Sequence, residues 1–458
     1  MKLSVLNIVF VSAFLSLASL SMAQPEIKSE KTTRILFILD ASKSMSGKWQ
    51  GQVKFKIASK ILSDVLDSLK TTDKLQVALR VYGHQRNYPP QNCNDTKLEV
   101  AFAANNFDRI KQRLKYIKPR GTSPIAMSLE RAKSDFGNKG NYRNIIILIS
   151  DGIEECDGDI CEASASLQKE GIAIKPFIIG IGADNSEIFD CAGSYFNAPD
   201  IDSFQSTLNI IIKKVLSKTT LQVNLLDKNG RAKESNINMA FTDLASGKIV
   251  YNFVHTLNNK GLPDTLVVDP LLEYKITLGT FPPLEINNVS LTQGKHNIVY
   301  ANCPRGKLSV VLSGNYPSEY KPKVIVKSIK NKIINTQWLG EKTSYLQGSY
   351  KIEVLSLPII ELDKINIEAD KTTTIKIDSP GILSIQKNIR VYGFLFYLTD
   401  NKQIKILDLN ENSSKPESVY LQPGFYRLVY RPIYSTQSAY SQTEDFEITS
   451  SKTTKIKL

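Results

Sequence analysis

The stretch Asp40-Ala41-Ser42-Lys43-Ser44 directly follows the aliphatic run Ile35–Leu39, and the stretch Ser150-Asp151-Gly152 directly follows a second such run, Ile145–Ile149. An uninterrupted aliphatic run is typical of a strand in a parallel sheet that helices cover on both faces. The carboxyl ends of such strands open on one edge of the sheet, where open α/β sheets bind ligands. The two stretches therefore predict an α/β fold with a polar site at that edge.

A third stretch, Gly121–Pro124, lies between the other two in the sequence. Together the three stretches offer two carboxylates and three hydroxyls, all of which are hard oxygen donors. Oxygen donors around an open site suit Mg²⁺, Mn²⁺ or Ca²⁺. The candidate metal ligands are Asp40, Ser42, Ser44, Thr122 and Asp151.

A simpler interpretation is that Ser42 and Ser44 only cap a helix that begins near Lys48, because serine is favoured at helix starts. Capping accounts for neither Thr122 nor Asp151, so we favour the metal site.

The order of these stretches resembles that of the von Willebrand factor A (vWA) family, and the resemblance covers roughly residues 32–217. In that family a metal-ion-dependent adhesion site is assembled from D-x-S-x-S, a Thr in a G-T-x-P-like loop and an Asp in an S/T-D-G turn; all five positions are filled here. The resemblance implies that the two serines, and usually the Thr, contact the metal directly or nearly so, while the aspartates bind directly or through water. One coordination position is left for an acidic group of a protein partner.

The resemblance also implies a doubly wound, mostly parallel six-stranded sheet. In such a sheet Val77–Gly83 is the second strand, Leu98–Phe102 a short antiparallel edge and Ile172–Gly182 the strand after Asp151. The chain departs from the family at Lys43, where members commonly carry a small residue. A cation there can weaken metal binding, help to hold an acidic ligand, or point to solvent.

The first residues are typical of an export signal. Met1-Lys2 is positively charged, the segment from Val5 to Leu20 is apolar with scattered serines, and Ser21-Met22-Ala23 places small residues before Gln24. We expect an exported bacterial protein that is periplasmic, surface-associated or secreted. No later run approaches the roughly 20 apolar residues of a membrane span, so we expect no transmembrane segment.

Five cysteines in an exported chain indicate disulfides before metal thiolates. Four of them, Cys93, Cys156, Cys161 and Cys191, fall in the vWA-like region. We favour Cys156–Cys161 with Cys93–Cys191, although the spacing alone does not decide among the three pairings, and a four-thiolate zinc site is the alternative. The fifth, Cys303, is either a buried free thiol or an intermolecular link.

The formal net charge of +13 is spread along the chain, so binding of nucleic acid is not implied. The one basic run, Lys111–Arg120, reads as the solvated face of a helix whose residues Ile110, Leu114 and Ile117 pack inward, with steering of a partner as the alternative. The acidic run Asp151–Glu162 can raise cation affinity or form a second, Ca²⁺-like site.

Beyond Val215 short alternating strands are punctuated by Gly, Pro and Asn, which is the pattern of β-sandwiches. Three similar stretches each carry an aromatic strand, centred on Tyr274, Tyr350 and Tyr426, and are internal repeats. These strands resemble those of PEGA-type and carboxypeptidase-regulatory-like sandwiches, which implies a stalk or spacer. The expected domains are a signal peptide (1–23), a vWA domain (24–217) and three β-sandwich modules (218–303, 304–379 and 380–458).

The sequence does not indicate an enzyme, because its three histidines are in no metal-pair spacing and it has no phosphate loop or nucleophile elbow. His84 lies at the end of the second strand, where it can cap the strand or contact a ligand, although a polar residue that merely closes a strand is the commoner case. We expect divalent-cation-dependent binding of a protein partner that offers an acidic side chain. The alternative is a structural or envelope-assembly component in which the metal only stabilises the domain.

Overall fold

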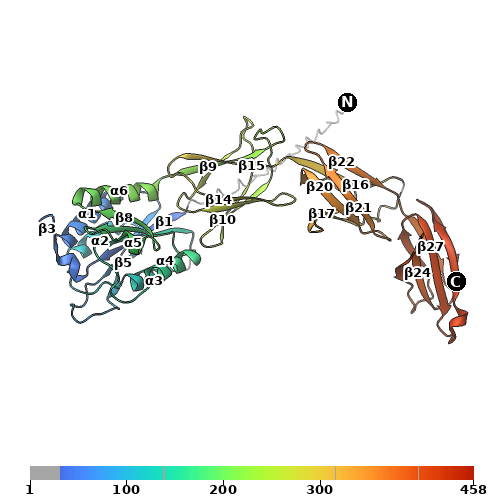
Figure 1. Cartoon of the computed structure of the whole chain (residues 1–458), viewed down its shortest axis with the longest axis horizontal. Coiled ribbons are helices and arrows are strands. Elements are labelled where there is room, and N and C mark those ends of the chain that lie inside the picture. The colour runs from blue at the N-terminus through green and yellow to red at the C-terminus, as the bar shows by residue number, and fades with distance from the viewer. Residues whose placement is uncertain (1–30, 138–139, 315, 401) are drawn as a thin grey trace, which may run out of the picture.

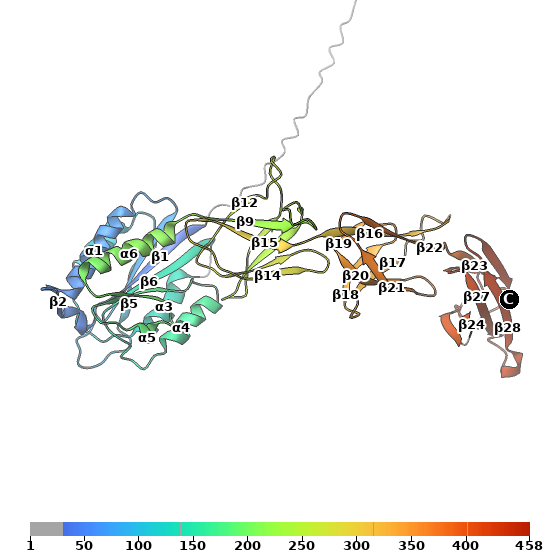
Figure 2. The ribbon, with the colours of Figure 1, turned by 45° about the horizontal axis from the view of Figure 1, so that its top comes forward.

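The computed structural model describes residues 31–137, 140–314, 316–400 and 402–458, so the expected signal peptide (1–23) lies outside the described residues. An α/β domain is followed by three all-β modules that succeed one another along the long axis (Figures 1 and 2). Within the described part of the chain, no helix is both long and apolar enough to cross a bilayer.

The α/β domain contains a six-stranded sheet with the order β5-β4-β1-β6-β7-β8. Its strands are parallel except β5, which pairs antiparallel with β4 at one edge. This confirms the expected fold, although the strand after Asp151 is shorter than the segment 172–182. The strands are β1 (Thr32–Asp40), β4 (Leu75–Tyr82), β5 (Thr96–Ala103), β6 (Tyr142–Ser150), β7 (Phe177–Ile181) and β8 (Ser194–Ala198).

Helices cover both faces of this sheet, as Figure 1 shows. Helices α1 (Lys54–Ser68), α2 (Phe107–Leu114) and α6 (Ile201–Leu216) pack with one apolar cluster. Helices α3 (Ile125–Phe136), α4 (Ile160–Lys169) and α5 (Ser186–Phe189) pack with the other. Burial of Ile110, Leu114 and Ile117 confirms the amphipathic interpretation of the basic run.

The helix expected near Lys48 begins instead at Lys54. A short 3₁₀ helix, η1 (Lys43–Ser46), and a hairpin of β2 (Lys48–Trp49) and β3 (Gln52–Val53) occupy the intervening residues. The two loop residues of this hairpin, Gln50 and Gly51, have φ of 48° and 82°, as tight hairpins require. No side-chain capping hydrogen bond forms at the start of η1 or α1, so the capping interpretation of the serines is wrong.

Each β module consists of a three-stranded and a four-stranded sheet around its own apolar cluster. In each, the first strand pairs parallel with the last. The first β module contains β9 (Thr219–Leu226), β10 (Asn238–Asp243), β11 (Ile249–Val254), β12 (Thr265–Val268), β13 (Tyr274–Leu278), β14 (Leu284–Val289) and β15 (His296–Asn302). The second contains β16 (Arg305–Leu312), β17 (Lys323–Ser328), β18 (Ile333–Trp338), β19 (Thr343–Leu346), β20 (Gly348–Val354), β21 (Ile360–Ile367) and β22 (Thr372–Ile377). The third contains β23 (Gly381–Gln386), β24 (Val391–Thr399), β25 (Lys402–Asp408), β26 (Glu417–Leu421), β27 (Gly424–Pro432), η2 (Ser438–Tyr440), β28 (Gln442–Ile448) and β29 (Thr453–Lys457).

The three repeated tyrosines explain the recurring aromatic strand. Each is buried, and each donates its hydroxyl hydrogen to a backbone carbonyl four or five residues earlier. A buried phenol needs such a partner, and the bond ties the strand to the chain that leads into it. The pairs are Tyr274 with Asp269 O (2.5 Å), Tyr350 with Leu346 O (2.7 Å) and Tyr426 with Gln422 O (2.6 Å).

Cys303 lies in the core of the first β module, where it is free and fully buried. Burial raises the pKa of its thiol to about 11. Of the two interpretations drawn from the sequence, the structure supports the buried free thiol.

We predict that Tyr426→Phe destabilises the third β module by about 1–2 kcal/mol, because the Gln422 carbonyl loses its hydrogen bond inside the core. Native-state hydrogen exchange of that module's amides in the intact chain measures the effect. The control is Tyr434→Phe, since Tyr434 is 70% exposed. Equal protection in both variants would contradict a structural role for the buried hydroxyl.

Candidate metal site

The two aspartates lie at the carboxyl ends of neighbouring strands. Asp40 is the last residue of β1, and Asp151 directly follows β6, which pairs parallel with β1. Asp40 is fully buried: its Oδ1 accepts from the Ser42 amide (2.7 Å) and its Oδ2 from the Ser150 hydroxyl (2.7 Å). The parallel register thus brings the two carboxylates to one edge of the sheet, as the aliphatic runs predicted.

The two serines connect these carboxylates. The Ser42 and Ser44 hydroxyl oxygens are 2.9 Å apart, and Ser44 donates to Asp151 Oδ1 at 2.7 Å. Four of the five candidate ligands, Asp40, Ser42, Ser44 and Asp151, are therefore linked by direct contacts. Ser44 is exposed, so this hydroxyl side of the site is open to solvent.

The fifth candidate, Thr122, lies in the adjoining loop. Gly121 forms a parallel bridge with Ser42 and accepts a hydrogen bond from the Lys43 amide at 2.8 Å. The Thr122 hydroxyl is engaged by the Asn92 amide, which donates to it at 3.0 Å. The structure therefore places Thr122 beside the other four through the backbone, with its hydroxyl bonded to a different loop.

Gly83 makes this close approach of loops possible. It has a φ of +70°, and a Cβ atom there would lie 2.6 Å from the Thr122 carbonyl oxygen and 2.7 Å from the Ser42 amide nitrogen. Backbone atoms this close cannot shift easily, so a side chain at position 83 would push the two loops apart.

The electrostatics of the site disfavour two bare carboxylates. Burial, reinforced by the neighbouring Asp151 carboxylate, raises the pKa of Asp40 to about 6, although hydrogen bonds from Ser42 and Ser150 oppose the shift. The Tyr82 hydroxyl donates to Ser150 Oγ at 3.0 Å, and burial raises the pKa of this phenol well above its usual value. The phenol therefore stays neutral and adds no negative charge, so the two carboxylates are the charges that a nearby cation would balance.

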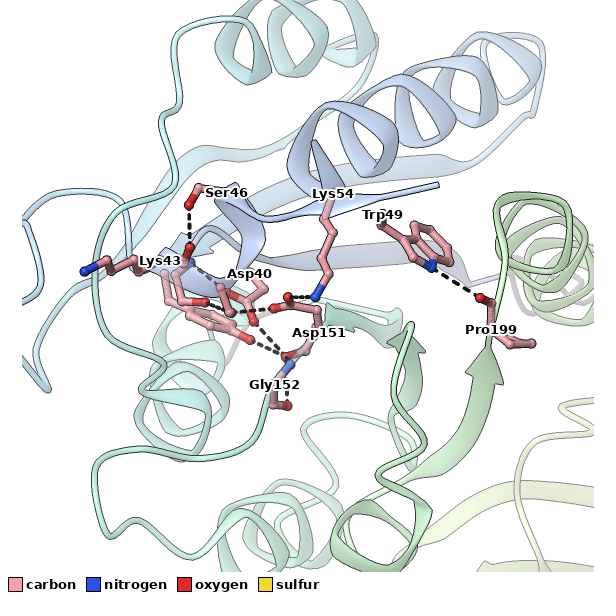
Figure 3. A network of polar contacts seen from close by, with 12 residues as sticks. Asp40, Lys43, Ser46, Trp49, Lys54, Asp151, Gly152 and Pro199 are labelled. Carbon is pink, nitrogen blue, oxygen red and sulfur yellow. Dashed lines mark hydrogen bonds and ion pairs between the residues drawn. The ribbon is translucent and has the colours of Figure 1, made fainter. Parts of the chain in front are cut away.

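Lys54 supplies part of the balancing positive charge, and the sequence analysis missed it. Its Nζ lies 2.6 Å from Asp151 Oδ2, and the Asp151 side chain is completely buried. Lys54 is the first residue of α1 and extends toward the aspartates (Figure 3). The contact depends on where the β2–β3 hairpin starts the helix, and no spacing rule in the sequence signals it.

Lys43, the departure from the family pattern, is exposed. Its Nζ lies 5.9 Å from the centre of the Tyr88 ring and points away from Asp40 and Asp151 in Figure 3. Of the three possibilities drawn from the sequence, the structure matches a side chain directed away from the carboxylates.

The acidic run after Asp151 holds the neighbouring Thr122 loop. Glu155 accepts from the Ser123 amide at 2.9 Å, and Glu154 accepts from the Ala126 amide at 2.6 Å in the first turn of α3. Among the described residues, no three or more His, Cys, Asp or Glu side chains are grouped to hold a metal, so the second-site alternative finds no ligand group. A metal at the candidate site would rely on hydroxyls beside two carboxylates.

The donor set fits a hard divalent cation. All five candidate side chains offer oxygen donors, and two of them are carboxylates. His84 is not part of this set: it is buried, and its Nε2 lies 2.9 Å from Glu99 Oε1. His84 lies two residues after the end of β4 and contacts β5 through Glu99.

Two disulfides flank the site, with a pairing that differs from the one expected. The bonds are Cys93–Cys156 and Cys161–Cys191, with Cα atoms 5.5 and 5.4 Å apart, so the expected pairs Cys156–Cys161 and Cys93–Cys191 are wrong. With all four cysteines in disulfides, the zinc alternative has no thiolates.

The neighbours of the short loop between Cys156 and Cys161 explain the difference. Its first end lies against the loop after β4, where the Gln91 side chain donates to the Glu155 carbonyl. Its other end is in the first turn of α4, which is bonded to the segment after α5 through Ser164 Oγ and the Ala192 carbonyl (2.5 Å). Each cysteine therefore meets a partner on a different element.

Comparison with known proteins places the α/β domain. Residues 35–210 match the family model of the von Willebrand factor type A domain. The uncharacterized protein YwmC of Bacillus subtilis (strain 168) is 30% identical over 165 residues, which cover 33% of this chain and 72% of YwmC. The chain belongs to the von Willebrand factor type A domain family.

Two further similarities extend the comparison. The uncharacterized protein YwmD of the same organism is 28% identical over 208 residues, which cover 42% of this chain and 92% of YwmD. The pilus adhesin SpaC from Lactobacillus rhamnosus GG is similar over 92% of this chain and 66% of its own, with 12% identity and a TM-score of 0.35. The alignments with YwmC and YwmD each span less than half of this chain.

We predict that peptide mapping of the non-reduced protein finds a Cys93 peptide linked to a Cys156 peptide, because the vWA domain brings these two loops together. A Cys161 peptide should be linked to a Cys191 peptide in the same digest. Mass spectrometry before and after reduction distinguishes this pattern from a bond between Cys156 and Cys161, which would contradict the structure.

Proposed function

We propose that the vWA domain binds a protein partner through a divalent cation, Mg²⁺ or else Mn²⁺ or Ca²⁺, held by Asp40, Ser42, Ser44, Thr122 and Asp151. The cation would supply a Lewis-acidic centre, and an acidic side chain of the partner would take its remaining coordination position. The observation that carries this proposal is the chain of contacts that links four of the five residues at the carboxyl edge of β1 and β6.

Charge supports this assignment. Two carboxylates converge in a buried place, and the structure balances them only in part, through the single ammonium group of Lys54. A divalent cation would add the charge that the buried pair lacks, and oxygen donors are the ligands it prefers. Because Ser44 is exposed, a partner can approach from that side.

The proposal assigns the remaining chain a supporting role. We propose that the β modules, with boundaries at 218–303, 304–379 and 380–458, act as a stalk or spacer for a non-enzymatic, exported protein at the cell surface, in the periplasm or outside the cell. The competing proposal is a metal that only stabilises the vWA domain, with no partner at its open position.

Partner binding by a Thr122→Val variant separates the two proposals. This substitution keeps the shape of the side chain and removes one hydroxyl. Adhesion requires that chelator and Thr122→Val both abolish capture of a partner from the native envelope while the domain remains folded. A purely structural metal would lower the melting temperature in both cases without removing any partner.

We predict that Asp151→Ala abolishes saturable binding of Mg²⁺ or Mn²⁺, because the site loses one of its two charged donors. The loss should exceed the roughly 10- to 100-fold that removal of an outer-shell partner costs. Titration calorimetry measures it, and circular dichroism checks that the buried strands survive. Asp157→Asn, an exposed position in the acidic run, is the control; equal affinity in Asp151→Ala and the unchanged protein would refute the site.

We predict that Lys54→Met raises divalent-cation affinity about tenfold, because a nearby positive charge opposes a cation. The same variant should be less stable without metal, since the buried Asp151 carboxylate loses its partner. Calorimetry and thermal unfolding with and without chelator measure both effects, with the exposed Lys56→Met as the control. Weaker metal binding in Lys54→Met would mean that Lys54 supports the ligands and does not compete with the metal.

A further inference from the structure

The third β module carries an aromatic and basic face on its four-stranded sheet. Strands β24 and β27 pair there with Tyr392 opposite Arg431 and Phe394 opposite Val429. Tyr392 and Phe394 are 40% and 38% exposed and are two residues apart on β24, so both lie on the outward side of the sheet. We call this surface the aromatic face; it consists of Tyr392, Phe394, Val429 and Arg431.

A hollow lies at the aromatic face. It has a volume of about 260 Å³ and is lined by the aromatic face together with Tyr430 and Ser441. Its lining combines apolar side chains with hydroxyl groups and a guanidinium. A hollow that combines apolar side chains with a few polar groups is typical of ligand binding.

In the other two modules the central strands carry no aromatic side chain at the outward positions that correspond to Tyr392 and Phe394, although the second module has an exposed aromatic on its neighbouring strand β18, Trp338, with Lys323 Nζ 5.1 Å from its ring. The outward positions of the corresponding central strands are Ala240, Thr242, Lys275 and Thr277 in the first module and Ile325, Lys327, Lys351 and Glu353 in the second. All three modules share the buried tyrosine described above (Tyr274, Tyr350 or Tyr426), so the role of that tyrosine in the core is common to all of them. The aromatic face is therefore a property that the third module has in addition to its fold.

The charges of the aromatic face are arranged to leave one cation available. Two cations lie outside the aromatic face and are paired: Arg427 is held by Asp445 in a bidentate ion pair (2.6 Å for both bonds), and Lys405, whose Nζ lies 5.0 Å from the centre of the Phe394 ring, is held by Asp408 at 2.7 Å. Arg431 has no ion-pair partner among the described residues, and its guanidinium carbon lies 5.6 Å from the centre of the Tyr392 ring. An arginine stacked in this way is oriented in advance to receive a carboxylate.

We propose that the third β module binds an acidic glycan, with a pyranose ring stacked on Tyr392 and Phe394 and its carboxylate paired with Arg431. One face of a pyranose ring carries C–H groups and packs on aromatic rings, while its hydroxyl groups need polar partners. Ser441 offers a hydroxyl group there, and the Tyr430 oxygen can accept a hydrogen bond while its own hydrogen is donated to Gln442 Oε1 at 2.6 Å. The hollow has room for a ring of this size.

The same observations disfavour other occupants. A lipid surface would be attracted by a cluster of cations, but the aromatic face has one unpaired cation. A folded protein would bury a far larger area than this hollow offers. A second copy of the chain remains an outcome of the test.

The experiment titrates the intact chain with an oligomer of galacturonic acid and, in parallel, with its methyl ester, which has the same rings without the charge. We expect saturable binding of the acid form and at least tenfold weaker binding of the ester. Tyr392→Ala and Arg431→Gln should each weaken binding of the acid form about tenfold or more. Two control variants should leave binding of the acid form unchanged. They are Phe425→Ala, at an exposed aromatic residue that shares strand β27 with Arg431 but lies outside the hollow, and Ile325→Ala in the second module.

Three results would overturn the inference: no binding at millimolar concentrations, equal losses in Phe425→Ala and Tyr392→Ala, or a face that instead mediates concentration-dependent self-association abolished by Tyr392→Ala. Chelator should leave glycan binding unchanged, because the candidate metal ligands belong to the vWA domain. Failure of the metal proposal and failure of the glycan proposal are thus separate results.

Discussion

The parallel pairing of β1 with β6 is the interaction on which the site depends. Both strands are apolar through their buried halves, and their register sets Leu39 beside Ile149. The next residues must then emerge together at one edge, whatever their chemistry. In this chain those residues are Asp40, Ser150 and Asp151, so burial of the hydrocarbon core itself forces two carboxylates into each other's neighbourhood.

That convergence creates an electrostatic problem that the rest of the site addresses. Hydrogen bonds from Ser42 and Ser150 hold Asp40, and Lys54 holds Asp151. These contacts satisfy the oxygens but leave two carboxylates close together in a buried place, so burial first, and the Asp151 carboxylate second, raise the pKa of Asp40. A bound cation would therefore stabilise the two carboxylates. Because Lys54 already neutralises part of their charge, this stabilisation would be smaller than it would be for two carboxylates without Lys54.

The parts of this structure that could be predicted from sequence are those set by local pattern. Aliphatic runs identified β1 and β6, and the positions of the oxygen donors after them identified the edge where they meet. The pairing of Cys161 with Cys191 could not be found in this way, because it depends on how α4 and α5 pack. Lys54 was missed for a similar reason: its reach to Asp151 follows from a hairpin that delays the start of α1. The alternation of Tyr392 and Phe394 is visible in the sequence, but which side of the strand faces solvent becomes known only from the sheet.

Strand β6 also determines how the β modules attach. Near its amino-terminal end, its second residue, Arg143, forms an ion pair with Asp269 of the first β module (Nη2 to Oδ1, 2.8 Å), and both side chains are largely buried. At its other end, Ser150 contacts Asp40. The attachment and the candidate metal site therefore lie at opposite ends of one rigid, buried strand. In Figure 1 the β2–β3 hairpin, which follows the D-x-S-x-S loop, accordingly lies at the end of the molecule away from the β modules. β modules joined in this way leave the carboxyl edge of the sheet unobstructed, which is the requirement for a partner to reach it.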